Sequence, residues 1–550
     1  MLRNFPLILI VFILSQCTPA EKQVSVSPTA SIEPYFDLNF TQAERDSLLA
    51  ELEQSKAHYE HIHAYRLENA TPPALQFNPV PVGFEWPVED GEKVSFQVTK
   101  NLEVPADMEE LAFFTVADLS ELIRTRKITS TALTKMYLSR LKKFGDTLQC
   151  VITLTEEVAL AQAARADDEI AQGKYRGPLH GIPYGIKDLL AVENTKTTWG
   201  AGPFKDQEID MTSTVVKKLE DAGAVMLVKL TLGALAMGDV WYGGVTKNPW
   251  DLTQGSSGSS AGSASATSAG LVAFSIGTET LGSIVSPSTR CGTSGLRPSY
   301  GRVSRTGAMA LSWSMDKIGP ICRSIQDCAI VFDAIIGTDD IDQTLVNTPY
   351  SFDGNRDITQ LRVGYFKDLF GEENRNATFD NATLEKLKEM GVKLEEVSLP
   401  DNMPVEPLIV ILLAEAAASF DEITRNNRDS LLVRQDINAW PNSFRSARFI
   451  PAVEYINANR IRYQLVQELY KALKDYDVIV TPSFGGTQLL TTNLTGYPCA
   501  VVPNGFNEAG RPVSISFISN LYDEGSALEL AHAYQKATDF EDKHPEMFKK

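Results

Sequence analysis

Residues 255–285 read GSSGSSAGSASATSAG, LVAFSI and GTETLGSIV in succession, and all sixteen residues from 255 to 270 are Gly, Ser, Ala or Thr. A flexible Gly/Ser linker would join independent domains. Here the small residues lead directly into an apolar segment, predicted as a strand at 271–274, and then into a second Gly/Ser turn. Small residues at this density allow one backbone segment to approach another closely. The stretch is therefore predicted to pack inside a domain, with successive N–H groups of 280–283 converging on an anion.

Outside this stretch, short apolar runs alternate with helical patterns. Strand-type runs occur at 224–228 and 478–480. Thr115 opens a helical pattern with Leu119 and Leu122, and a second helical pattern covers 133–141. This alternation predicts an α/β fold in which helices cover both faces of a sheet.

A second unusual stretch lies upstream at 181–188, GIPYGIKD. It combines a Gly/Pro-rich turn with an apolar strand that carries one lysine, Lys187. A lysine in such surroundings must reach solvent, pair with an acid or lose its proton, because desolvation disfavours the ammonium. Taken alone, the stretch favours a paired or solvent-reaching lysine.

The overall composition is that of a globular protein. The chain has 550 residues, 43% of them hydrophobic, and Lys+Arg 51 against Asp+Glu 70 gives a net charge of −19. Disorder throughout is excluded by the hydrophobic content. A main nucleic-acid partner is disfavoured, because phosphate binding requires concentrated positive charge.

The N-terminus has the pattern of a bacterial export signal. Arg3 precedes the apolar run LILIVFIL at 7–14, which is too short to span a bilayer. The sequence LSQC at 14–17 is similar to a lipobox, in which the signal is cut before the cysteine and lipid is attached to its sulfur. We therefore expect a lipoprotein signal peptide at 1–16 and a lipid on Cys17, with plain secretion as the alternative. The localisation expected is periplasmic or cell-surface, on a bacterium.

Four further regions are expected after the signal. Residues 17–40 are rich in Ser, Thr and Pro and suggest a flexible tether, and 41–111 form a helical and Pro-rich extension. Its helix is predicted at 42–67 from the capping box Thr41-x-x-Glu44. A histidine cluster at 58, 61 and 63 suggests either a solvated helix face, which is favoured, or a metal site. The main domain is expected at 112–540 and a tail at 541–550.

Five cysteines remain after Cys17, and their odd number and wide scatter predict buried free thiols rather than a disulfide framework. The alternative is a disulfide between the two cysteines that are nearest in sequence, Cys322 and Cys328. The remaining cysteines are Cys150, Cys291, Cys322, Cys328 and Cys499.

The motifs and their order resemble those of the amidase signature hydrolases. That family combines G-G-S-S-G-G-S, G-T-D-x-G-G-S-I-R, C-G and G-L-K-P-x-x-G-R-V-S. The counterparts here are 257–263 (SGSSAGS), 277–285 (GTETLGSIV), 291–292 (CG) and 295–304 (GLRPSYGRVS). Further landmarks similar to the family's are 181–188, 248–250 (NPW), 316–320 (DKIGP) and 495–498 (TGYP). The resemblance covers about 112–540 and implies an α/β/α sandwich around a mixed, twisted central sheet.

The resemblance also implies a set of catalytic residues. The nucleophilic serine falls on Ser283, the serine after a cis peptide bond on Ser259, and the lysine on Lys187. A serine hydroxyl is a weak nucleophile, and a lysine acts as its base only when burial leaves it neutral near working pH. Backbone N–H groups are implied to stabilise the tetrahedral oxyanion. They belong to Thr280, Leu281, Gly282 and Ser283.

Three residues depart from the family pattern. Glu279 stands in place of Asp, Leu281 replaces a glycine of the oxyanion turn, and Val285 replaces an arginine. We expect Leu281 to narrow the acyl pocket, while Arg290 is a candidate to replace the missing arginine. Ser257 and Ala261 each replace a glycine, which matters only if a positive φ is required there.

The function expected is an exported amide hydrolase that acts on linear carboxamides through an acyl-enzyme on Ser283. The resemblance implies no metal and no organic cofactor, and the partners expected are a small or peptide-like amide and the membrane. One alternative is an inactive binding lipoprotein with the same fold. Another is an esterase of the α/β-hydrolase type, since residues 258–262 (GSSAG) also fit G-x-S-x-G. That motif needs a preceding strand, and 248–254 is not predicted as one. The family's tRNA-dependent amidotransferase enzymes are disfavoured by the signal and the negative charge.

Overall fold

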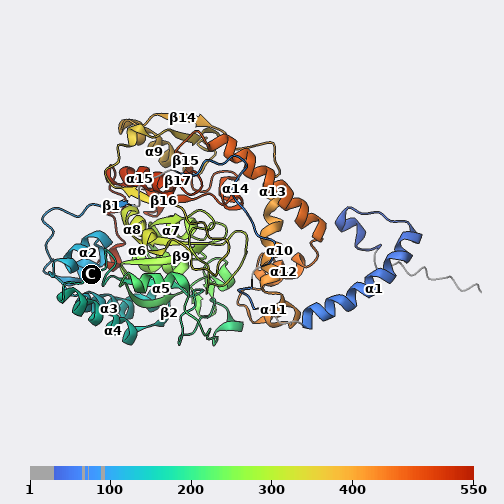
Figure 1. The fold of residues 1–550 in the computed structure, drawn as a ribbon, viewed down its shortest axis with the longest axis horizontal. Helices are drawn as coiled ribbons and strands as arrows, with labels where there is room; N and C mark the ends of the chain where they lie inside the picture. Colours follow the sequence, from blue (N-terminus) through green and yellow to red (C-terminus); the bar gives the residue numbers. More distant parts are fainter. Residues whose placement is uncertain (1–29, 65–67, 72, 88–92, 550) are drawn as a thin grey trace, which may run out of the picture. The chain divides into compact units, whose positions relative to one another are not determined.

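The computed structural model describes residues 30–64, 68–71, 73–87 and 93–549 (Figure 1). The chain divides into two compact units, residues 1–68 and 69–550, so the extension predicted at 41–111 contributes to both. The predicted signal peptide and Cys17 lie outside the described residues.

The described part of the first unit contains one 3₁₀ helix and one long α-helix, α1, over Gln42–Ala64. The predicted capping box is present, because Thr41 N donates to Glu44 Oε2 over 2.6 Å and Glu44 N donates to Thr41 Oγ1 over 3.4 Å. The predicted end of this helix at 67 lies outside the described residues. His58 and His61 have exposed positions on α1.

The second unit is built on an 11-stranded sheet that combines parallel and antiparallel pairs. Its spatial order is β14-β13-β15-β17-β16-β10-β11-β9-β3-β4-β2. The bounds are β2 Val151–Leu154, β3 Pro183–Lys187, β4 Val225–Leu230, β9 Phe274–Glu279, β10 Ser294–Arg297, β11 Lys317–Cys322, β13 Val363–Phe366, β14 Leu394–Val397, β15 Val478–Pro482, β16 Cys499–Phe506 and β17 Pro512–Ser519. Strand β9 pairs in parallel with β3 and antiparallel with β11, which places the predicted functional segments side by side at the sheet centre.

Helices cover both faces of this sheet. Along β16, Val501 packs with Val285 of α7 (Val285–Cys291), whereas its neighbour Val502 belongs to the core that contains Leu530 of α15 (Glu524–Lys536). Because successive strand residues point to opposite faces, α7 and α15 lie on opposite sides. Together with the mixed sheet, this arrangement confirms the predicted α/β fold.

The remaining helices surround this frame. Their bounds are α2 Val116–Arg124, α3 Ser130–Leu148, α4 Glu156–Ala171, α5 Thr214–Asp221, α6 Ala261–Ser268, α7 Val285–Cys291, α8 Ile325–Ile335, α9 Ala377–Glu389, α10 Ile409–Ser419, α11 Asp421–Arg425, α12 Trp440–Ala447, α13 Ala452–Leu473, α14 Gln488–Thr495 and α15 Glu524–Lys536. The predicted opening of a helix by Thr115 is confirmed, since its side chain accepts from Asp118 N at the start of α2.

Two local predictions in the Ser-rich region are wrong. The strand expected at 271–274 begins only at Phe274, because α6 ends at Ser268 and Gly270 turns the chain with φ +65°. The segment 248–254, predicted to be non-strand, contains β8 (Asp251–Gly255), which pairs with β7 (Lys247–Asn248). This two-stranded ribbon is separate from the central sheet.

The five cysteines after Cys17 are all free and buried, as predicted. No described helix is long and apolar enough to cross a membrane. In the described ranges, no three His, Cys, Asp or Glu side chains are grouped as metal ligands would be.

Candidate active site

Lys187 ends the central strand β3 and is completely buried. Its Nζ donates to Ser259 Oγ over 2.8 Å and to Thr278 Oγ1 over 2.8 Å, and it also lies 3.2 Å from Ser260 Oγ. Among the residues that the structure describes, no carboxylate forms an ion pair with this amine. The prediction that Lys187 is paired with an acid or reaches solvent is therefore wrong, and hydroxyl groups surround it instead.

These surroundings determine the protonation state of Lys187. Burial lowers the pKa of its amine from 10.5 to about 7, although the carboxylates of Asp316 and Glu279 act in the opposite direction. A neutral amine is then present in quantity near neutral pH. Lys187 can therefore accept a proton from a neighbouring hydroxyl, which is what a general base must do.

Ser259 lies in the loop between β8 and α6, and the peptide bond between Gly258 and Ser259 is cis. This is the geometry that the family resemblance implies. Gly258 is closely packed, since a Cβ atom at this position would lie 1.9 Å from the carbonyl oxygen of Gly238. Ser257, which replaces a glycine of the family pattern, has φ +60°, so the position does require the left-handed region.

Ser260 is the serine that the α/β-hydrolase alternative would use. Its hydroxyl is buried, donates to Thr278 O over 3.0 Å and accepts from Thr278 N over 3.1 Å. Lys187 supplies a further donor. With its partners satisfied inside the protein and its preceding strand outside the central sheet, Ser260 is a structural residue rather than an exposed nucleophile.

Ser283 lies in the turn that joins β9 to α7. Within the described part of the chain, the backbone N–H groups of Thr280, Leu281, Gly282 and Ser283 donate to no acceptor of the protein. Gly282 has φ +79°, which the turn requires and which glycine adopts readily. Consecutive N–H groups with no internal partner are available to an oxygen that carries developing negative charge.

Glu279 fixes the shape of this turn. Its Oε2 accepts from Ile284 N over 2.9 Å and from Val285 N over 3.0 Å. Its Oε1 accepts from Arg297 over 2.9 Å, in an ion pair that is completely buried. Burial alone would raise the pKa of Glu279, but the Arg297 guanidinium and the Val285 N–H group lower it to about 2.

The structure shows the surroundings of the residues at 279, 281 and 285, which depart from the family pattern. Arg297, rather than Arg290, is the cation next to the turn, and Arg290 is exposed and 3.3 Å from Gln254 Oε1. Val285 is buried in an apolar cluster. Leu281 packs against the main core and is absent from the lining of the cavity described next, so its expected narrowing of that space is not observed.

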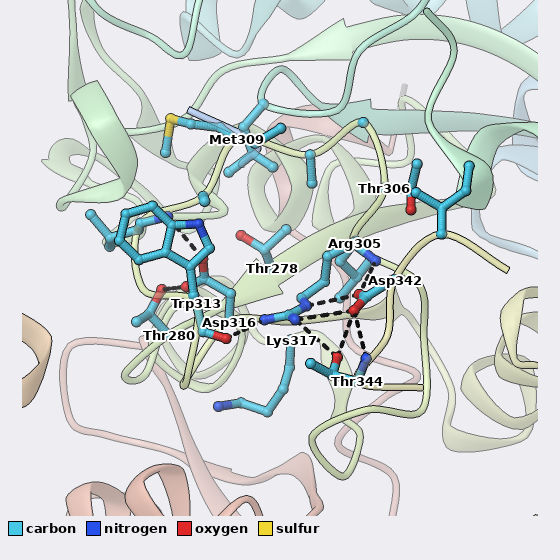
Figure 2. A pocket seen from close by; sticks show the side chains of 18 of the residues that line it. Thr278, Thr280, Arg305, Thr306, Met309, Trp313, Asp316, Lys317, Asp342 and Thr344 are labelled. Carbon is cyan, nitrogen blue, oxygen red and sulfur yellow. Dashed lines mark hydrogen bonds and ion pairs between the residues drawn. The ribbon is translucent and has the colours of Figure 1, made fainter. Parts of the chain in front are cut away.

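A cavity of about 220 Å³ adjoins these groups. Figure 2 shows Thr278 near the centre, with Met309, Trp313 and Thr280 on one side and Arg305, Asp342 and Thr344 on the other. Asp316 also lines the cavity. Thr278 also accepts from Lys187, and Thr280 belongs to the turn with free N–H groups. The cavity therefore opens next to the predicted catalytic residues.

Sequence reasoning gave no role to three residues of this site: Thr278, Arg297 and Asp316. Asp316 accepts from Thr280 Oγ1 over 2.6 Å and from Leu311 N over 2.8 Å. All three lie within the quoted motifs, at the ends of β9, β10 and β11 or next to them. Their presence at strand ends beside the Ser-rich segment is the signal that could have identified them.

Comparisons with known proteins match most of the chain to one family. A family model described as Amidase matches residues 132–491. One glutamyl-tRNA(Gln) amidotransferase chain, from Marinomonas sp., is 33% identical over 482 residues, which cover 79% of this chain and 99% of the relative. The structure of native peptide amidase from Stenotrophomonas maltophilia aligns with TM-score 0.70 and 28% identity, over 78% of this chain and 98% of that chain. An amidase family protein from Bacillus anthracis aligns with TM-score 0.71 and 26% identity, over 80% and 93%.

Proposed function

The chain belongs to the amidase family of enzymes that act on carbon–nitrogen bonds, and from this premise we propose that it is an exported hydrolase of linear carboxamides. We assign the nucleophile to Ser283, the proton relay to Ser259 and the base to Lys187. The observation that carries the proposal is the buried Lys187 amine, which bonds Ser259 Oγ over 2.8 Å and has no carboxylate partner among the described residues.

The reaction begins with proton transfer away from Ser283. Its hydroxyl proton passes to Ser259, whose own proton passes to the neutral Lys187 amine. Ser283 Oγ then attacks the carbonyl carbon of the amide and forms a tetrahedral intermediate. The N–H groups of residues 280–283 are placed to stabilise the oxyanion, at about 3 kcal/mol per donor in comparable sites.

Collapse of this intermediate breaks the carbon–nitrogen bond. The proton held by Lys187 returns through Ser259 to the leaving nitrogen, so ammonia or an amine departs neutral and the acyl group remains as an ester on Ser283. Water then attacks the ester as its proton passes through Ser259 to the Lys187 amine. When the second tetrahedral intermediate collapses, this proton returns through Ser259 to Ser283 Oγ and the carboxylic acid is released. Asp316 and Glu279 fix the turn that carries Ser283, because Asp316 accepts a hydrogen bond from Thr280 Oγ1 and Glu279 accepts one from Ile284 N.

A second candidate is a glutamyl-tRNA(Gln) amidotransferase function, which is what the name of the Marinomonas relative states. The net charge of −19 and the N-terminal segment favour the hydrolase, because a partner of charged tRNA operates in the cytoplasm and meets a polyanion. The inactive binding protein is disfavoured by the retention of Lys187, Ser259 and Ser283 together.

The proposed export rests on the N-terminal sequence alone. The charged, apolar and LSQC segments of residues 1–17 support a periplasmic or cell-surface lipoprotein anchored through Cys17. Metabolic labelling of a producing bacterium with a fatty-acid analogue tests this assignment. Labelling that is lost in Cys17→Ser supports the anchor, and equal labelling of both proteins contradicts it.

The catalytic assignment is tested with a serine-reactive fluorophosphonate on the full chain in detergent, followed by peptide mapping. We expect modification of Ser283, no modification in Ser283→Ala, and slower modification in Lys187→Ala. Modification at Ser260 would instead favour the α/β-hydrolase type of enzyme. No modification, together with no hydrolysis of any carboxamide, would favour the inactive binding protein.

A further inference from the structure

The cavity beside the site has a wall that comes from outside the matched family region. We call the described residues 69–71 and 73–87 the arm. They precede the matched residues 132–491 and belong to the same compact unit as the central sheet. Ala70 and Gln76 of the arm line the cavity.

The arm is tied to two different parts of the cavity rim. Asn69 Nδ2 donates to Ala310 O over 2.9 Å, and Ala310 N donates back to Asn69 Oδ1 over 2.7 Å. Further along, Gln76 Nε2 donates to Gln343 Oε1 over 2.9 Å. Both partners, Ala310 and Gln343, line the cavity themselves. The arm is thus attached to the rim at Asn69, next to Ala70, and at Gln76 itself.

Beyond Gln76, the arm is held by aromatic contacts. The Phe77 ring meets Tyr300 edge-on at 5.3 Å, and the Arg462 guanidinium lies 3.5 Å from the Phe77 ring centre. Tyr300 in turn stacks under Arg305 at 4.9 Å and donates to Trp313 O over 2.7 Å. Arg305 and Trp313 are cavity residues, so the arm is coupled to the wall that they form.

The cavity wall has charged groups, but each is bound within the protein. Arg305 pairs with Asp342 at 3.0 Å, and the Lys317 amine donates to Met315 O. Asp316 accepts from Thr280 and from two backbone N–H groups. The other side of the cavity is apolar and includes Met309 and Trp313 (Figure 2). Burial lowers the pKa of the Lys317 amine well below its usual value, which disfavours a cation that could bind an anionic substrate group. A neutral apolar group would disturb none of these internal bonds.

We propose that the arm is the specificity element of this enzyme, and that Ala70 and Gln76 limit the cavity to carboxamides with a neutral, apolar acyl part of moderate size. The inference rests on the proposed function only in naming the occupant as the acyl part of the substrate. Independently of the reaction, the inference states that Ala70 and Gln76 limit the size of the molecule that can bind in the cavity.

The test is calorimetric binding of two neutral amides, phenylacetamide and diphenylacetamide, to full-length protein that carries Ser283→Ala. Binding measured in this way does not depend on turnover. Gln76→Ala should tighten diphenylacetamide about tenfold and leave phenylacetamide within about twofold, because it enlarges the space at the rim. Ala70→Phe should weaken diphenylacetamide about tenfold or more by filling that space.

Leu75→Ala is the matched control, since Leu75 lies in the arm, is 76% exposed and is absent from the cavity lining. It should leave both affinities unchanged. An unchanged ratio of the two dissociation constants in Gln76→Ala and Ala70→Phe would overturn the inference. Tighter binding of 4-carboxyphenylacetamide than of phenylacetamide would overturn the neutral character of the site.

The inference and the proposed function can fail separately. If the affinity ratio shifts as expected but the wild-type protein hydrolyses no carboxamide, the arm remains a size filter and the catalytic proposal fails. If hydrolysis is observed and the ratio does not shift, the catalytic proposal stands and the arm has no role in specificity.

Discussion

Two lysines at the centre of the sheet occupy nearly equivalent positions and have different surroundings. Lys187 ends β3 and Lys229 lies on the adjacent β4, where its register partner is Ile186. Both side chains are completely buried. Lys229 forms an ion pair of 2.9 Å with Asp188, and it also donates to Thr197 Oγ1 over 2.6 Å. Lys187 has hydroxyl partners and no ion pair within the described residues.

This difference indicates that burial alone is not sufficient for the role of base that we propose for Lys187. Burial lowers the pKa of both amines, and carboxylates act against the shift at both. At Lys187 the opposing carboxylates, Asp316 and Glu279, form no ion pair with the amine, whereas at Lys229 the Asp188 carboxylate is in direct contact over 2.9 Å. A buried ammonium paired with a carboxylate is held in its charged form, because loss of its proton would leave the carboxylate uncompensated. An amine among hydroxyl groups can move a proton from one of them to another. We therefore expect Lys229 to contribute mainly to stability and Lys187 mainly to catalysis, although both lie in the same sheet.

The strongest test of this contrast is Lys187→Met. Because the base is removed, kcat for an acyl anilide should fall by about 10²–10⁴-fold. The unfolding free energy should not fall by more than about 1 kcal/mol, since no buried carboxylate is left without its partner. Steady-state kinetics and denaturant unfolding check the two expectations. A variant that unfolds and loses activity in parallel would contradict the separation.

Lys229→Met should have the opposite profile. It leaves Asp188 buried without its cation, so the unfolding free energy should fall by about 3–5 kcal/mol. The folded fraction should keep its kcat, because Lys229 does not contact Ser259 or Ser283. Denaturant unfolding followed by circular dichroism measures the loss. Asp188→Asn combined with Lys229→Met is the control and should recover part of the stability, which would not occur if the methionine were simply a poor fit.

The acid limb of the pH profile should report Lys187. Since its pKa is lowered to about 7, kcat/KM should rise as pH increases through that value. The Asp316 carboxylate favours the ammonium, so Asp316→Asn should move this limb to lower pH. Rate measurements between about pH 5 and 9 test the shift, and a limb that moves to higher pH would exclude Lys187 as the titrating base.

Stability should also depend on pH through the same group. The unfolded chain binds more protons than the folded chain between about pH 7 and 10.5, so the unfolding free energy should increase with pH in this window. This contribution should disappear in Lys187→Met. If the two proteins have parallel profiles over this range, the folded amine does not have a lowered pKa.

The smallest effect is expected for a lysine whose ion pair is exposed. Lys142 lies 2.7 Å from Glu156, a shorter distance than that of Lys229 and Asp188, but both side chains are about half exposed. Lys142→Gln should change the unfolding free energy by less than about 1 kcal/mol, because solvent screens the pair. A loss comparable with that of Lys229→Met would show that pairing distance, and not burial, determines the contribution.

Much of the frame was predictable from local signals. Thr115 and Thr41 open helices as their side-chain chemistry predicts, because each accepts from a backbone N–H group three residues later. The runs at 224–228 and 478–480 correspond to β4 and β15. The errors at 248–254 and 271–274 have a common cause. The strand β8 is stabilised by a partner strand, and the turn after α6 by a positive φ at Gly270, neither of which a local apolar pattern reveals.

The departures from the family pattern could not be interpreted in the same way. The sequence offered Arg290 as the nearest substitute for the arginine missing at 285, but Arg297 forms the buried pair with Glu279. The reason is geometric: β10 carries Arg297 into the sheet, whereas the end of α7 leaves Arg290 exposed. Likewise, Leu281 packs against the core and is not among the residues that line the cavity.

By itself, the sequence determined the α/β class, the order of the motifs and the candidates Lys187, Ser259 and Ser283, because these depend on residue type and local spacing. The tertiary structure alone decided which buried lysine has a carboxylate partner and which has hydroxyls, since Asp188 is adjacent to Lys187 in sequence but pairs with Lys229 in space. It also decided that Ala70 and Gln76, distant from every motif, line the cavity beside the site. Contacts between remote segments follow from how strands pair and chains pack, and local patterns do not encode them.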